Sequence, residues 1–217
     1  FMERVWNYAS RDVYNQWQSG VYSYEVEQGP QRVAIKMTCP GTVGVGKRMT
    51  FEKTISLTAG SSAVRADYRF SIGQEAMVPM RAGLWWHNRL GVPQEATTYF
   101  VPTAEGVQSV TYGAGGGGEY WWNDPARGWT AALSESATGV AAIMDFPPLM
   151  CFYHYMGGDV STAEWAFRSQ EIPNGGSVET TIWLLPFVGK GAVAGAGPRV
   201  VAQVEAPAQS DAPGQVM

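Results

Sequence analysis

The sequence has 217 residues, and its 15 basic and 19 acidic side chains give a formal net charge of −4. No Lys/Arg-rich stretch offers a surface that could neutralise a phosphate backbone, so we expect no nucleic-acid partner. No apolar run is long enough to span a bilayer, so we expect no membrane span. A charged fraction of only 16%, with 26 glycines, is typical of a β-rich chain with many tight turns.

The N-terminal part of the chain contains the one segment that fits a helix. Ser10 is a suitable N-cap, and Val13 and Trp17 lie four residues apart, on one helical face, so we expect one short helix at 10–18. The period then changes to two. We expect strands at 21–27 and 32–37, joined by a turn, and a Gly-rich loop at 40–46.

The best-specified hairpin comes next. In 48–57, Met49, Phe51, Ile55 and Leu57 share one face, interrupted only by Lys53. The segment 63–71 returns with apolar residues on one face and charged residues on the other. This alternation predicts two antiparallel strands with one buried face.

Further strand patterns follow at short spacing, and no fixed-period repeat is evident. Together they predict an all-β fold, a large antiparallel β-sandwich. The expected strands are 80–86, 97–102, 107–112, 118–122, 128–135, 140–146, 149–156, 162–169, 177–186 and 199–205.

The stretch from Leu84 to Trp129 holds five of the nine tryptophans, interleaved with polar side chains. Rings that pack on C–H faces, beside groups that bond hydroxyls, suit a sugar ligand. The same rings could instead be core residues of a β protein. In each Trp-Trp pair, alternation lets one ring face a cleft. The candidate sugar-binding residues are Trp85, Trp86, Asn88, Trp121, Trp122, Asn123, Asp124, Tyr153 and His154.

The glycine run 113–118 does not predict a phosphate-binding loop. Such a loop needs a following helix start, whereas a strand pattern follows here. There is no GxSxG motif for a serine nucleophile. The two cysteines, Cys39 and Cys151, are far apart, so a zinc site is not expected, and their pairing is left open. We expect no metal site and no cofactor.

Two residues are candidates for acid–base chemistry. His87 ends an apolar strand, and an imidazole titrates near neutral pH, so it could act as a general acid or base. It could equally donate a simple hydrogen bond. Glu164 occupies a strand position beside Trp165, where a carboxylate needs a partner or a ligand. Arg168, four residues on, offers a structural ion pair instead.

The order of these features resembles galactose-mutarotase-like domains over residues 20–188. The resemblance rests on paired strands that contain Lys53-Thr54-Ile55-Ser56-Leu57 and Val64-Arg65-Ala66-Asp67-Tyr68-Arg69-Phe70. Trp86-His87-Asn88 and Thr98-Tyr99-Phe100-Val101-Pro102 come next. Glu164-Trp165, the turn Pro173-Asn174-Gly175-Gly176 and a last strand through Trp183 and Pro186 complete it.

The resemblance implies a β-supersandwich with a concave face that receives carbohydrate. Epimerases of this class use a His as general acid and a Glu as general base, which implies these roles for His87 and Glu164. The usual neighbours of both residues are missing here, which puts epimerase activity in doubt. The class also includes accessory domains of glycoside hydrolases and polysaccharide lyases, and fold alone does not fix function.

We therefore expect a carbohydrate-binding or carbohydrate-processing domain at 1–188. A linker, or the start of a following domain, with a partly disordered tail is expected at 189–217. The expected partners are a carbohydrate ligand and other domains of the same, longer polypeptide, with an extracellular or periplasmic location favoured. The alternatives are an aldose epimerase or lyase/hydrolase sandwich domain, and a non-catalytic assembly domain whose aromatic rings are core.

Overall fold

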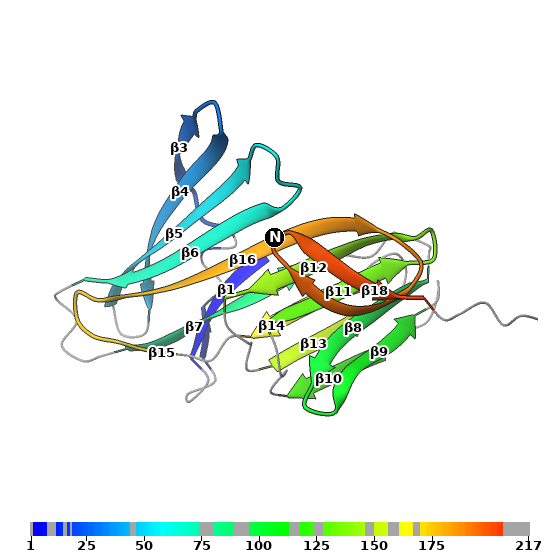
Figure 1. Cartoon of the computed structure of the whole chain (residues 1–217). Coiled ribbons are helices and arrows are strands. Elements are labelled where there is room, and N and C mark those ends of the chain that lie inside the picture. Colours follow the sequence, from blue (N-terminus) through cyan, green and yellow to red (C-terminus); the bar gives the residue numbers. More distant parts are fainter. Residues whose placement is uncertain are drawn as a thin grey trace, which may run out of the picture.

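The computed structural model describes residues 2–7, 12–14, 17, 19–43, 47–73, 80–88, 96–112, 118–123, 128–145, 150–155, 161–166 and 170–205. Across these residues the chain forms strands and no helix, so the all-β prediction is confirmed. Two sheets and one separate hairpin account for the strands (Figure 1). For β1, β2, β7, β10, β13 and β14 the description covers backbone and register and, of the side chains, only Trp165.

The larger sheet is antiparallel throughout and has nine strands. Strand β16 lies between β6 and β12, so the last long strand joins the early hairpins to the middle of the chain. In spatial order the strands are β3 (Ser23–Gln28), β4 (Arg32–Val43), β5 (Lys47–Thr58), β6 (Val64–Ile72), β16 (Ser177–Val188), β12 (Thr138–Met144), β11 (Trp129–Ser134), β8 (Thr97–Thr103) and β9 (Gly106–Tyr112).

The second sheet has seven strands, also paired antiparallel. Its strands come from distant parts of the sequence, because β1 pairs with β7 and β7 in turn pairs with β14. In spatial order it contains β10 (Gly118–Asn123), β13 (Met150–Tyr155), β14 (Ser161–Ala166), β7 (Met80–Asn88), β1 (Met2–Asn7) and β2 (Asp12–Tyr14), with β15 (Gln170–Ile172) paired to β7.

The hairpin expected at 48–57 and 63–71 is confirmed as β5 and β6. Its register runs from Met49 opposite Ile72 to Leu57 opposite Val64. Phe51 is fully buried, stacked on Phe70 with ring centroids 5.0 Å apart. The alternation in sequence thus buries one face, because successive side chains of a strand point to opposite sides.

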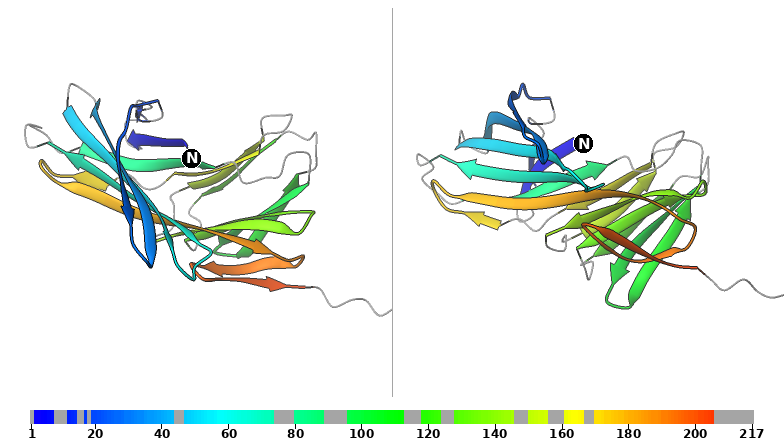
Figure 2. Two further views of the ribbon diagram at one scale, coloured as in Figure 1. Left: turned by 90° about the horizontal axis from the view of Figure 1, so that it is seen from above. Right: turned by 45° about the horizontal axis from the view of Figure 1, so that its top comes forward.

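The main core lies between the two sheets (Figure 2). Trp165 of β14 and Ile172 of β15 are both fully buried, in one cluster with Phe51 and Phe70 of the nine-stranded sheet. Aromatic side chains supply much of this contact area, which is the usual role of buried rings in a sandwich. The seven-stranded sheet therefore turns the face that carries Trp165 toward the nine-stranded sheet.

A second core lies on the other side of the nine-stranded sheet. The hairpin of β17 (Ala192–Gly197) and β18 (Val200–Val204) packs against β11 and β12, and Val193 is buried there with Trp129 and Leu185. This explains why every residue of β11 is buried, since the strand is covered on both faces. The expected domain boundary at residue 188 stays a prediction.

The helix expected at 10–18 is wrong where the structure describes the segment. Asp12–Tyr14 forms β2, paired with β1, and Trp17 lies in a turn. Trp17 is buried, and its indole Nε1 donates a hydrogen bond of 3.1 Å to the Cys39 carbonyl. The spacing of Val13 and Trp17 fits a helix, but strand pairing and burial of the ring in the core decide the local structure.

The loop expected at 40–46 is also corrected, because β4 continues to Val43 with Pro40 opposite Thr50. The partner strand β3 pairs with β4 only as far as Thr38. Beyond that point β4 has no β3 partner and is an edge on that side, the position in a sheet where proline is tolerated. In the described part of the chain, no helix has the length and apolarity to cross a membrane.

Candidate functional site

Strands β7 and β14 bring the two acid–base candidates together. In their antiparallel register, Glu164 lies directly opposite His87, although 77 residues separate them in sequence (164 − 87). On the other side of β7, Met2 of β1 is the residue opposite His87. Directly opposed residues of an antiparallel pair have Cβ atoms about 4.5–5.5 Å apart, so the backbone holds both positions at one place on the sheet.

Strands β13 and β10 extend this sheet and carry most of the remaining candidates. Phe152 lies opposite Glu164 on one side and opposite Trp121 on the other. His154 lies opposite Glu119, and Tyr153 lies opposite Tyr120. Strands β7 and β10 from the aromatic stretch, and strands β13 and β14, therefore lie side by side in one sheet. Asp124 lies outside the described residues.

The register also divides the candidates between the two faces of the sheet. Trp165 is fully buried in the main core, which fixes the inward face of β14. Residues directly opposite one another, or two apart on one strand, occupy the same face. Positions on the Trp165 face are Trp86, Asn88, Trp122 and Tyr153, and positions on the outward face are Trp85, His87, Trp121, Asn123, His154 and Glu164.

Some aromatic side chains of the sequence are core residues. Trp17, Trp129 and Trp165 are all buried, and Trp129 belongs to the aromatic stretch that suggested a sugar site. The core interpretation of the aromatic stretch is therefore correct for Trp129. The question of ligand contact remains for the pairs Trp85-Trp86 and Trp121-Trp122, whose strands lie in the sheet described above.

The glycine run precedes a strand rather than a helix. Residues 113–117 lie outside the described part of the chain, and Gly118 begins β10. A phosphate loop requires the N–H groups of a helix start to point at the anion, and a strand in this place does not supply that geometry. The strand expected at 118–122 is therefore confirmed.

Cys39 is a free, buried cysteine. Burial raises the pKa of its thiol, and the Lys53 ammonium lowers it by a smaller amount. A thiol held protonated is a weak nucleophile, which gives Cys39 a packing role. No group of three or more His, Cys, Asp or Glu side chains that could hold a metal ion occurs among the described residues.

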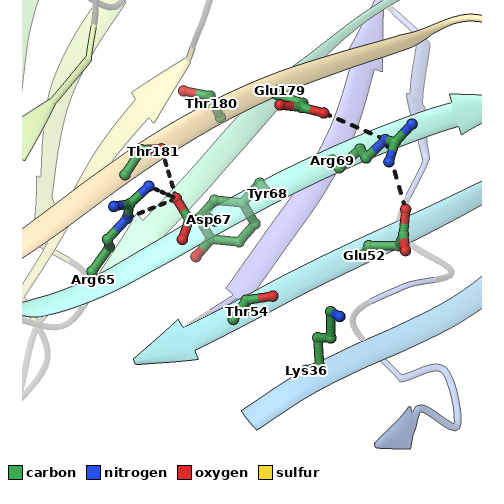
Figure 3. Close-up of a pocket in the computed structure, with 10 residues that line it drawn as sticks. All are labelled: Lys36, Glu52, Thr54, Arg65, Asp67, Tyr68, Arg69, Glu179, Thr180 and Thr181. Atoms are coloured by element: carbon green, nitrogen blue, oxygen red, sulfur yellow. Dashed lines mark hydrogen bonds and ion pairs between the residues drawn. The ribbon is translucent and has the colours of Figure 1, made fainter. Parts of the chain in front are cut away.

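A polar groove on the nine-stranded sheet was not anticipated as a site. It has a volume of about 340 Å³ and crosses β4, β5, β6 and β16 (Figure 3). The signal was present in the alternating charges of Arg65, Asp67 and Arg69, but the same alternation is typical of any solvated face. The charged residues that line it are Lys36, Arg65, Arg69, Glu52, Asp67 and Glu179.

No protein-family model and no curated protein matches the sequence. Solved structures do match. A proposed aldose 1-epimerase from Klebsiella pneumoniae aligns with a TM-score of 0.61 and 12% identity over 85% of this chain and 61% of its own. An α-N-acetylgalactosaminidase from Bifidobacterium bifidum has the same TM-score and identity, over 87% of this chain.

A galactose 1-epimerase from Lactobacillus acidophilus aligns with a TM-score of 0.51 and 9% identity, over 86% of this chain and 76% of its own. The chain spans 61% of the Klebsiella protein and only 31% of the glycosidase. Identities this low establish architecture and leave the chemistry to the residues present. The chain has the galactose-mutarotase-like β-supersandwich fold expected from its sequence.

Proposed function

We propose that this chain is a carbohydrate-binding domain that holds a sugar on the outward face of the seven-stranded sheet. One observation carries the proposal: His87 and Glu164 occupy directly opposed positions on that face. Trp85 and Trp121 occupy the same face, on β7 and β10. The supersandwich fold of a galactose 1-epimerase and a glycosidase adds support for sugar chemistry.

The chemistry of these positions suits a sugar ring. A pyranose has C–H faces that pack on an indole and a rim of hydroxyls that both donate and accept hydrogen bonds. An imidazole and a carboxylate next to each other supply one group that donates and one that accepts. Asn123 and His154, also at outward positions, extend the polar rim along β10 and β13.

The same pair of residues supports acid–base catalysis as a second candidate function. Opening an aldose ring requires a proton to leave the anomeric hydroxyl and a proton to reach the ring oxygen. Both oxygens are attached to the anomeric carbon, so two neighbouring groups can serve them together. The opposed register of His87 and Glu164 is compatible with this arrangement and favours the isomerase alternative over a hydrolase or lyase.

Binding is tested by comparing neighbouring tryptophans that lie on opposite faces. Calorimetry with galactose, glucose and N-acetylgalactosamine should show sugar binding by the unaltered chain. Trp85→Ala and Trp121→Ala should each weaken it about tenfold, a loss of about 1.4 kcal/mol, with folding retained. Trp86→Ala and Trp122→Ala should instead destabilise the fold by about 3 to 5 kcal/mol, because they remove rings from inward positions.

Two results would contradict the proposal. The first is an absence of binding to all three sugars by the unaltered, folded chain. The second is unchanged affinity in both Trp85→Ala and Trp121→Ala, which would leave the outward face without a role. Thermal unfolding of all four variants separates lost binding from lost folding.

A further inference from the structure

We propose that the polar groove on the outer face of β4, β5, β6 and β16 is a second saccharide-binding site, for an uncharged sugar. The inference rests on the proposed function, because it assigns a further binding site for the same class of ligand. The groove lies on the nine-stranded sheet, on the face turned away from the main core (Figure 3). It therefore cannot be a part of the surface that carries His87 and Glu164.

The groove is built by two cross-strand rows. In the first, Lys36 lies opposite Thr54, Thr54 opposite Asp67, and Asp67 opposite Thr181. In the second, Arg69 lies between Glu52 and Glu179. Strand pairing thus fixes the spacing of donors and acceptors along a surface four strands wide. A volume of about 340 Å³ is at the lower end of the range for small-molecule sites.

The charged side chains that line the groove indicate which kind of ligand it can bind. Three cationic side chains, Lys36, Arg65 and Arg69, face three anionic ones, Glu52, Asp67 and Glu179, so the formal sum is zero. Such a surface attracts neither an anion nor a cation over distance. It does present many donors and acceptors side by side, and hydroxyl groups satisfy both kinds. A neutral polyhydroxylated ligand fits this pattern.

The groups around Arg69 can change partners at little cost. The Arg69 Nε lies 3.8 Å from Glu52 Oε2 and 3.5 Å from Glu179 Oε1. Both distances are longer than the roughly 2.7–2.9 Å of strong charged hydrogen bonds. These side chains are well exposed, and exposed ion pairs contribute about 0–1 kcal/mol. A sugar hydroxyl can therefore insert between the partners without a large loss of stability.

Asp67 is held more firmly and orients the other end of the groove. Its Oδ1 accepts hydrogen bonds of 2.9 Å from Arg65 Nε and 2.8 Å from the Thr181 hydroxyl. Arg65 lies over the Trp183 ring, 5.6 Å from its centroid. Tyr68, whose ring belongs to the main core, is the one aromatic residue of the described lining. With no ring to stack on, the sugar is held by hydrogen bonds, and binding is weaker than on the aromatic face.

The test follows the amide NMR chemical shifts of the protein while lactose, maltose or cellobiose, all neutral disaccharides, is added. Residues whose chemical shifts change mark where each sugar binds. We expect shifts at Thr54, Asp67 and Thr181 that saturate at higher concentration than those on β7 and β14. Thr54→Trp fills the groove and leaves the ion pairs intact, and it should abolish the groove shifts. The matched control, Ser109→Trp, places the same ring at an exposed position of β9 on the same sheet and should leave them unchanged.

Arg69→Gln provides a second variant, because it keeps the shape of the groove and removes one cation. It should weaken the groove shifts even if Thr54→Trp fails to fold. Chemical-shift changes confined to β7 and β14 would overturn the second site, and the proposed function would still stand. Shifts on neither face would overturn both, and groove shifts that persist in Arg69→Gln and in folded Thr54→Trp would overturn the groove assignment.

Discussion

His87 and Glu164 hold positions that depend entirely on strand pairing. They come from β7 and β14, and their opposition is fixed by one register. A shift of that register by a single residue would move one of them to the inward face, where Trp165 is buried. The burial of Trp165 in the main core therefore opposes such a shift.

At the scale of single residues, we predict that the pair acts as a unit if the chain is catalytic. His87→Gln and Glu164→Gln should each lower the rate of anomerisation of α-galactose by about 10²- to 10⁴-fold, followed by polarimetry, with sugar affinity nearly unchanged. Glu25→Gln, on the exposed strand β3, is the matched control and should keep full activity. Full activity in either of the first two variants would eliminate the catalytic alternative and leave binding untouched.

Trp17 shows how a single residue closes the N-terminal part of the core. Its ring packs against Gly41 so closely that a Cβ added there would lie 2.8 Å from the indole. The Tyr22 hydroxyl donates a hydrogen bond of 2.8 Å to the Trp17 carbonyl. Trp17, Gly41 and Cys39 thus form one contact that ties the turn before β3 to β4, which no local pattern in the sequence indicated.

Among the elements, the apolar face of β5 is buried in the middle of the strand and exposed near its end. Phe51 lies in the middle of the main core, whereas Leu57 near the end of the strand is 47% exposed. Both belong to the same apolar face. The neighbouring strands follow the same trend, because Val26 of β3 and Ile35 of β4 are also exposed on that face. The apolar face of the nine-stranded sheet thus continues beyond its buried part.

We predict that this gradient is visible in the stability of two variants. Phe51→Ala should lower the free energy of unfolding by about 3 to 5 kcal/mol, because it leaves a cavity among stacked rings. Val26→Thr keeps β-branching at a position that is 54% exposed and should change it by no more than about 0.5 kcal/mol. Urea unfolding measures both, and an equal loss in the two variants would contradict a core that ends before β3.

For the whole molecule, the hairpin β17–β18 acts as a cover over the outer side of β11 and β12. Val193 is 1% exposed, in a cluster with Trp129, Leu133 and Leu185. Gln203 reinforces the closure of the hairpin, because its Nε2 donates to the Gly191 carbonyl at 3.0 Å. Removal of the hairpin would expose these apolar side chains to water.

We therefore predict that a chain ending at residue 188 is less stable than one ending at residue 205. The shorter chain should unfold at a lower temperature and bind a hydrophobic dye, since burial of apolar area is the main stabilising contribution lost. The control truncation at 205 removes only residues beyond β18. Equal unfolding temperatures of the two chains would support the domain boundary that the sequence suggested at 188.

The sequence by itself determined most of the strands and the inward face of β5–β6, which follow from period-two alternation and turn chemistry acting over a few neighbouring residues. Its resemblance to galactose-mutarotase-like domains implied the supersandwich fold. Only the tertiary structure decided which strands meet. The opposition of His87 and Glu164, the outward assignment of Trp85 and Trp121, and the groove across four strands all depend on long-range register. Local patterns carry no information about such pairings, because a strand's alternation is the same whichever partner it finds.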